Sequence, residues 1–152
     1  MKPKNILLVE NNNDDATLAQ LAFKKGSFTS NLIIVRDGAE ALEYLFGTGS
    51  YQGRDAACVP DIILLDLKMP KLSGFEVLRR VRSDERTRMV PVIILSSSLE
   101  PQDLRKGYDL GANSYIRKPL DFTEFIDVVR NLETYWFVIN QLPPHEAGGK
   151  VS

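Results

Sequence analysis

The chain has 152 residues, of which 43% are hydrophobic and 26% are charged, and this composition suits one globular domain that buries its own core. Nineteen basic residues stand against twenty acidic ones, so no basic surplus indicates a nucleic-acid partner. The single cysteine, Cys58, the lack of an apolar signal segment and the lack of a bilayer-length apolar run favour a soluble cytoplasmic protein without membrane contacts.

Short apolar runs alternate with segments of helical periodicity. The apolar runs predict strands at residues 6–9, 32–35, 62–65, 92–95 and 115–116. Apolar residues at helical spacing predict helices at 14–25, 39–46, 74–82 and 102–110. Asp121, with Glu124 three positions later, predicts the start of a last helix that ends before Pro143.

This alternation is typical of a parallel sheet that is covered by helices on both faces. We therefore expect an α/β fold, a flavodoxin-like doubly wound sheet of five parallel strands, in one domain over residues 1–143. A long loop at 47–59 and an extension of the last helix to about residue 141 are predicted additions to this plan. Residues 144–152 are expected to form a flexible tail.

Polar residues directly follow four of the predicted strands. Glu10 and Asn11 follow the first, Asp66 the third, Ser96 the fourth and Lys118 the fifth. Ligand sites of open parallel sheets lie outside the carboxyl ends of the strands, so these side chains are expected to converge at one edge. Taken alone, Asp66 could equally be a turn residue before a proline, and only the joint set favours a site.

The converging groups are those that phosphoryl transfer to a carboxylate requires. An aspartate nucleophile, here Asp66, forms an acyl phosphate. Glu10 and Asp66 offer the hard oxygen ligands that suit Mg²⁺, and a backbone carbonyl such as that of Lys68 could complete the metal shell. Lys118 can pair with the phosphoryl group as a point charge, and Ser96 can donate a hydrogen bond to it.

At these residues the chain resembles the receiver domain of two-component response regulators. The resemblance rests on the order and spacing of five segments, at residues 6–10, 64–70, 74, 91–96 and 111–119. It implies the following roles: Asp66 as phosphoacceptor; Glu10, Asn11, Asp66 and the Lys68 carbonyl as the Mg²⁺ site; Ser96 as switch hydroxyl; Tyr115 as switch aromatic; and Lys118 as phosphate-pairing lysine. It also implies a cis peptide bond between Lys118 and Pro119, since cis bonds occur almost only before proline. On pattern alone, Tyr115 could also be ordinary core.

The long loop and the aromatic last helix resemble the single-domain regulators that partner phytochrome histidine kinases. This likeness implies a sensor histidine kinase as phosphodonor and a homodimer formed by the last helix. Tyr135, Trp136 and Phe137 are the expected dimer or partner surface, although packing against their own domain is the alternative. Output is expected through protein contacts or through a downstream phosphotransfer protein, and no enzyme activity beyond the protein's own phosphorylation chemistry is expected.

Asn11 departs from the family pattern, which has two acids after the first strand. An amide oxygen can bind Mg²⁺ but brings no charge, so weaker metal binding and slower phosphorylation are expected. The alternative is a pseudo-receiver that binds partners without efficient phosphorylation. Asp14 or Asp15 could compensate, but both occupy the first turn of a predicted helix, where acids stabilise the helix, and that structural role is the favoured one. Lys68 stands where a phosphatase would need a second acid.

Overall fold

The computed structural model describes residues 3–144. Its centre is a sheet of five parallel strands in the order β2-β1-β3-β4-β5. The strands are β1 (Lys4–Val9), β2 (Ser30–Val35), β3 (Ile62–Leu65), β4 (Val92–Ser96) and β5 (Ser114–Arg117). The strand order reverses between β1 and β3, which is the position where open α/β sheets form ligand sites. The predicted α/β class and parallel sheet are confirmed.

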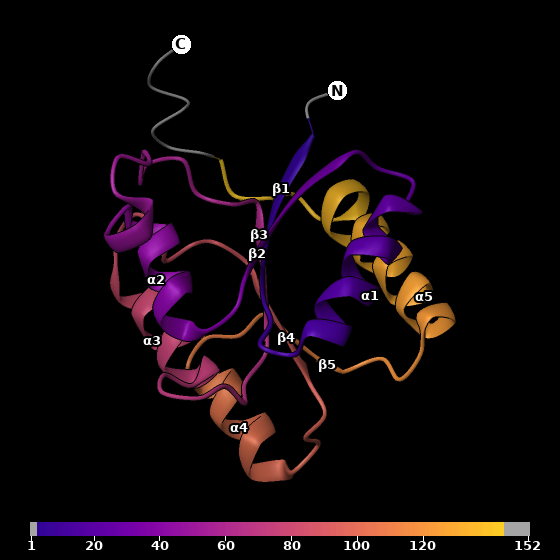
Figure 1. Ribbon diagram of the computed structural model, residues 1–152. Helices are drawn as coiled ribbons and strands as arrows, with labels where there is room; N and C mark the ends of the chain where they lie inside the picture. The colour runs from indigo at the N-terminus through magenta and orange to yellow at the C-terminus, as the bar shows by residue number, and fades with distance from the viewer. Residues whose placement is uncertain (1–2, 145–152) are drawn as a thin grey trace.

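Helices cover both faces of the sheet (Figure 1). They are α1 (Asn13–Lys24), α2 (Gly38–Phe46), α3 (Gly74–Ser83), α4 (Pro101–Asp109) and α5 (Phe122–Glu133). Helices α1 and α5 lie on one side, and α2, α3 and α4 lie on the other. The observed limits of the first four helices agree with the predicted limits to within one residue.

Two apolar cores lie on the two sides of the sheet because successive strand residues point to opposite faces. In β1, Leu7 and Val9 join the core under α2 and α3, whereas Ile6 and Leu8 join the core under α1 and α5. Strands β3 and β4 are buried along their whole length, which explains why their sequences are continuously apolar. The core therefore fixes the register of the strands and, with it, the residues that reach the edge of the sheet.

Side-chain caps define where the helices begin. Asn12, Asp37, Ser73 and Asp121 each accept a hydrogen bond from the backbone N–H three residues later. Such caps satisfy N–H groups that have no partner inside the helix. The N-cap role predicted for Asp121 is confirmed, with a distance of 2.9 Å from the Glu124 N–H.

The long loop between α2 and β3 is held by local contacts. Gly47 ends α2 in the left-handed conformation, with φ of 67°, and a 3₁₀ turn follows at Gly49–Tyr51. The Arg54 guanidinium donates to the backbone carbonyls of Tyr44 and Cys58 and stacks on the Tyr44 ring. The loop is thus a folded part of the domain.

The last helix continues beyond α5 as π-helical turns over Thr134–Ile139. The predicted extension is therefore present, in a wider form of helix than expected. The expected tail at 144–152 lies outside the described residues apart from Pro144. In the part of the chain that the structure describes, no helix is both long enough and apolar enough to span a membrane.

Candidate functional site

The sheet delivers the site residues to one edge through its own hydrogen-bond ladder. The Glu10 N–H donates to the Val35 carbonyl at 3.0 Å, and the Asp66 N–H donates to the Val9 carbonyl at 3.1 Å. On the far side, the Lys118 N–H donates to the Ser96 carbonyl at 2.8 Å. These bonds extend the pairing of the strands by one residue and fix where each side chain starts.

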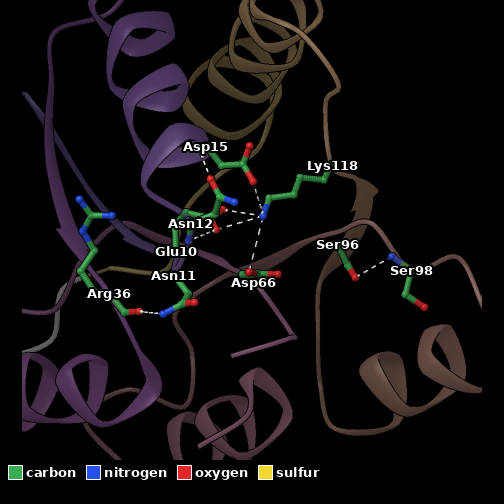
Figure 2. A network of polar contacts seen from close by, with 9 residues as sticks. All are labelled: Glu10, Asn11, Asn12, Asp15, Arg36, Asp66, Ser96, Ser98 and Lys118. Carbon is green, nitrogen blue, oxygen red and sulfur yellow. Dashed lines mark hydrogen bonds and ion pairs between the residues drawn. The ribbon is translucent and has the colours of Figure 1, made fainter. Parts of the chain in front are cut away.

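Three carboxylates surround the Lys118 ammonium group, as Figure 2 shows. Lys118 Nζ lies 3.0 Å from Oε1 and 3.0 Å from Oε2 of Glu10, 2.8 Å from Oδ2 of Asp15 and 3.6 Å from Oδ2 of Asp66. Glu10 and Asp66 are nearly hidden from solvent, at 2% and 7% exposure. Three negative groups thus share one positive group in a buried place.

Burial acts on the acid–base properties of this cluster. It raises the pKa of Glu10 above the usual value, and the charge of Asp66 adds to that rise. Burial also raises the pKa of Asp66, although Lys118 opposes it. Burial alone would lower the pKa of Lys118, but hydrogen bonds to Asp15 and Glu10 outweigh it and raise that pKa, so the lysine stays protonated. One ammonium group does not compensate these carboxylates fully.

The turn after β3 wraps closely around Asp66. The Lys68 N–H donates to the Asp66 carboxylate and lowers its pKa, which places a backbone donor on the acid. Gly74 begins α3 so close to this turn that a Cβ atom there would lie 2.2 Å from the Asp66 carbonyl oxygen. Only glycine allows this approach, which explains why that residue type stands at the start of α3.

Asn11 lies at the mouth of the site, where its side-chain N–H donates to the Arg36 carbonyl at 3.1 Å. This bond orients the amide, and Figure 2 shows its oxygen on the side turned toward Asp66. The neighbouring Asn12 N–H donates to Oε2 of Glu10 at 3.0 Å. Asn11 is therefore held where an amide oxygen could act as a neutral ligand.

Ser96 is completely buried, and its hydroxyl is turned away from Asp66 toward Ser98 (Figure 2). The Ser98 N–H donates to Ser96 Oγ at 3.0 Å, and the Ser98 hydroxyl donates to Oδ2 of Asp103 at 2.6 Å. Asp103 of α4 thus anchors the loop whose Ser98 N–H is hydrogen-bonded to the Ser96 hydroxyl. For Ser96 to contact a group on Asp66, its bond with Ser98 has to break.

Tyr115 of β5 belongs to the same loop network. Its hydroxyl donates to the Ser98 carbonyl at 2.7 Å, and its ring packs against the core under α3. The competing expectations for Tyr115, core residue and switch residue, are therefore not exclusive. Its ring packs in the core, while its hydroxyl is bonded to the loop after β4.

The expected cis bond before Pro119 is wrong, because the described residues contain no cis peptide bond. A trans bond is also the more stable form of an X–Pro peptide, by about 0.5–1 kcal/mol. Lys118 reaches the acidic cluster with this trans bond in place. The structure thus brings Lys118 to the carboxylates without the cis peptide bond that the resemblance implies.

The aromatic run after α5 divides between core and surface. Trp136 is 8% exposed and belongs to the core under α1 and α5, and Phe137 packs against that core and against the Phe28 ring. For Trp136 and Phe137 the structure therefore favours the alternative expectation, packing against their own domain, because both bury apolar area there. Tyr135, at 48% exposure, remains on the surface.

Sequence reasoning offers Asp15 a part in the cluster only as the less favoured alternative. The pattern favours a helix-terminus role for Asp15, yet its carboxylate makes the shortest contact with Lys118. Sequence reasoning does not identify Asp103, because its hydrogen bond with Ser98 has no local sequence signature. The available signal for Asp15 was its place in the first turn of α1, close to the residues that follow β1.

The residues present fit a divalent cation. Within residues 3–144, no three acidic, histidine or cysteine side chains form a metal-chelating group by themselves. The cluster instead offers two buried carboxylates, Glu10 and Asp66, whose anionic forms burial disfavours, beside the amide of Asn11. Such a site, with few carboxylates and open positions, is typical of Mg²⁺ that shares its coordination with phosphate oxygens and water.

Comparison with known proteins identifies the family. Residues 6–130 match the response regulator receiver domain. The chain is 40% identical to the probable methanogenesis regulatory protein FilR2 of Methanothrix harundinacea, over 93% of this chain and 88% of that protein. It is 34% identical to response regulator Rcp1 of Synechocystis sp., over 93% of this chain and 94% of that protein.

Solved structures give the same result. The phosphorylated cyanobacterial phytochrome response regulator RcpA is 37% identical and superposes with a TM-score of 0.86, over 94% of this chain and 100% of RcpA. The Mn(2+)-bound form of Rcp1 superposes with a TM-score of 0.83, at 34% identity, over 93% of this chain and 100% of Rcp1. The chain therefore belongs to the family of response regulator receiver domains, and along nearly its whole length it is similar to phytochrome response regulators.

Proposed function

We propose that the chain is a phosphoacceptor switch in which Asp66 receives a phosphoryl group from a sensor histidine kinase. The observation that carries the proposal is the arrangement of Asp66 beside Glu10 and Lys118, at the edge where the sheet order reverses. A buried carboxylate with a backbone donor and one cation nearby is suited to nucleophilic attack on phosphorus.

In the proposed reaction an Asp66 carboxylate oxygen attacks the phosphorus of a phosphohistidine. The new P–O bond forms while the P–N bond breaks, and the imidazole leaves with the bonding electrons and takes up a proton from solvent. Lys118, which the cluster keeps protonated, pairs with the incoming phosphoryl oxygens. Ser96 leaves Ser98 and donates its hydroxyl hydrogen to a phosphoryl oxygen, which is the conformational signal.

Mg²⁺ is the proposed cation of this site. Glu10, Asp66, the Asn11 amide oxygen and the Lys68 carbonyl are the proposed ligands, and the cation would neutralise the two anions that approach one another. The neutral Asn11 leaves the reaction feasible but lowers the negative charge of the site. Support for a divalent ion at such a site comes from Rcp1, which is described in a Mn(2+)-bound form.

The proposal is tested by incubating the full chain with acetyl phosphate and Mg²⁺ and measuring its intact mass. We expect the mass of one added phosphoryl group, stable in acid and lost in alkali. The adduct should disappear with EDTA and with Asp66→Asn. A wild-type protein that gains no such adduct over a range of Mg²⁺ concentrations would favour the pseudo-receiver alternative, in which Asn11 removes phosphorylation.

For the phosphodonor we propose a histidine kinase of phytochrome type, since RcpA is a phytochrome response regulator. FilR2 is a probable methanogenesis regulatory protein, so the second candidate that we propose is a histidine kinase that acts in such regulation. Phosphotransfer rates from one phosphorylated kinase of each class distinguish them. Faster transfer from the phytochrome kinase is expected, and a preference for the other donor would contradict it.

We also propose that the surface of the segment after α5 joins two copies of the chain. Tyr135, Val138 and Ile139 are 48%, 56% and 64% exposed, an unusual group of large apolar side chains on one short segment. Sedimentation equilibrium tests this proposal. We expect a dimer that Val138→Glu and Ile139→Glu weaken, and a monomer throughout the micromolar range would contradict it. A downstream phosphotransfer protein is a further candidate partner.

A further inference from the structure

We propose that Asp15 is a positioning residue of the phosphorylation site, which holds the Lys118 ammonium group and so compensates for the missing acid at position 11. This inference rests on the proposed function of the site. Asp15 lies on α1, whereas Glu10 and Asp66 follow strands, so the fold brings a third independent element to the same lysine. Its distance of 2.8 Å from Lys118 Nζ is the shortest in the cluster.

The charge balance gives Asp15 its importance. Glu10, Asp66 and Lys118 with a neutral Asn11 carry a net charge of −1, because two carboxylates face one ammonium group. Adding Asp15 brings the net charge to −2, the value that an acid at position 11 would give. Asp15, on a helix, therefore supplies the negative charge that Asn11 lacks.

Geometry makes Asp15 act through Lys118. The ammonium group contacts both carboxylate oxygens of Glu10 and lies near one carboxylate oxygen of Asp66. These two carboxylates are also proposed ligands of the divalent cation. A lysine with no other partner would compete with the cation for them. Asp15 stands on the opposite side of Lys118 from Asp66, as Figure 2 shows, and offers a partner that the lysine can keep when the cation binds.

The helix-terminus role does not account for this contact. Asp14 and Asp15 both belong to the first turn of α1 and would both favour the helix dipole. Among the contacts of the described residues, Lys118 is bound by Asp15 and not by Asp14. The N-cap bond at this turn is made by the backbone N–H of Asp15 to Asn12, so an amide side chain at position 15 leaves it intact.

The test is calorimetric titration of the full, unphosphorylated chain with Mg²⁺. Asp15→Asn should weaken Mg²⁺ binding by about threefold to tenfold, since one unit charge acts near a divalent ion in a partly solvated place. Asp14→Asn makes the same change of charge on the same helical turn and should leave the affinity unchanged. Adding Asn11→Asp to Asp15→Asn should restore the affinity to the wild-type value or above it.

A second comparison tests the route through Lys118. In a Lys118→Met background, Asp15→Asn should weaken Mg²⁺ binding less than it does in the wild type, because no ammonium group competes for Glu10 and Asp66. An undiminished effect there, or equal affinities of wild type and Asp15→Asn, would overturn the inference. Equal weakening by Asp14→Asn would also overturn it. If the wild type neither binds Mg²⁺ nor accepts phosphate, the proposed function itself fails.

Discussion

The strand-end cluster and the end of α5 both bury carboxylates, but of these carboxylates only those of the cluster form an ion pair within residues 3–144. Glu133, the last residue of α5, is 1% exposed, and its Oε1 accepts a hydrogen bond from the Ser27 N–H at 3.1 Å. Its Oε2 is buried without a hydrogen-bond partner among the described residues. Burial raises the pKa of Glu133, as it raises those of Glu10 and Asp66.

A raised pKa therefore marks burial in both regions and does not by itself identify a site. What distinguishes the cluster is that carboxylates from two strand ends and one helix meet around Lys118. Glu133 instead ties the end of α5 to the loop before β2. Substitutions in the cluster should change phosphorylation, whereas substitutions at the end of α5 should change stability.

The largest effect is expected for Trp136→Ala at the end of α5. This side chain is part of the core, so its removal should lower the free energy of unfolding by about 3–5 kcal/mol. The matched variant Tyr135→Ala removes a half-exposed ring and should change it by about 0.5 kcal/mol or less. Urea unfolding followed by circular dichroism measures both, and equal losses would show that the burial of Trp136 is not decisive.

The second effect is the loss of phosphorylation in Lys118→Met. Removing the ammonium group that pairs with Glu10 and Asp66 should slow the reaction with acetyl phosphate by about a hundredfold, a size typical of removing one electrostatic contact to a transition state. The same variant should bind Mg²⁺ more tightly, since Glu10 loses a competing partner. Lys24→Met, on the exposed side of α1, is the control. A phosphorylation rate near that of the control would remove Lys118 from the mechanism.

The third effect concerns pH and stability at the end of α5. A carboxyl whose pKa is raised in the folded state contributes stability that is complete below its ordinary pKa of 4.5 and is lost as pH rises through the folded pKa. Glu133→Gln should thus match the wild type in acid and exceed it at neutral pH, because a tenfold difference in proton affinity between the folded and unfolded chains corresponds to about 1.4 kcal/mol. Unfolding curves from acid to neutral pH check this difference. A constant offset at every pH would contradict it.

The smallest effect is expected for the loop after β4. Asp103→Ala removes the acceptor of the Ser98 hydroxyl and should cost about 0.5–1 kcal/mol, because the bond is only partly buried. It should also speed hydrogen exchange at the Ser98 N–H, which Ser96 holds in the wild type. Amide exchange by NMR measures this change. Unaltered exchange would show that Asp103 does not anchor the loop.

The sequence predicted most of the fold because its apolar runs are long enough to require buried strands. Glu10, Asp66 and Lys118 could be placed together for the same reason, since parallel strands end at a common edge. The contacts between these side chains and residues of other elements were harder to predict from the sequence. Asp15 obeys the preference of helix termini for acids, so its contact with Lys118 cannot be predicted before the start of α1 and the residue after β5 are known to lie at the same edge of the sheet.

The end of α5 shows a second limit of sequence reasoning. In a regular α-helix, the spacing of three to four residues would place Leu132, Trp136 and Ile139 on one face. The π-helical turns change the register, so Phe137 packs against the core while Ile139 is 64% exposed. A sequence pattern read at 3.6 residues per turn does not predict such a widening.

Borohydride reduction of the phosphorylated chain tests the central claim most directly. The reagent converts an aspartyl phosphate to homoserine, and peptide mass spectrometry then identifies the residue that carried the phosphoryl group. After treatment with acetyl phosphate and Mg²⁺, homoserine is predicted at position 66, and at no other acidic position of the cluster. Reduction at position 10 or 15, or an unreduced position 66 in a protein that carries phosphate, would contradict the assignment of Asp66 as the phosphoacceptor.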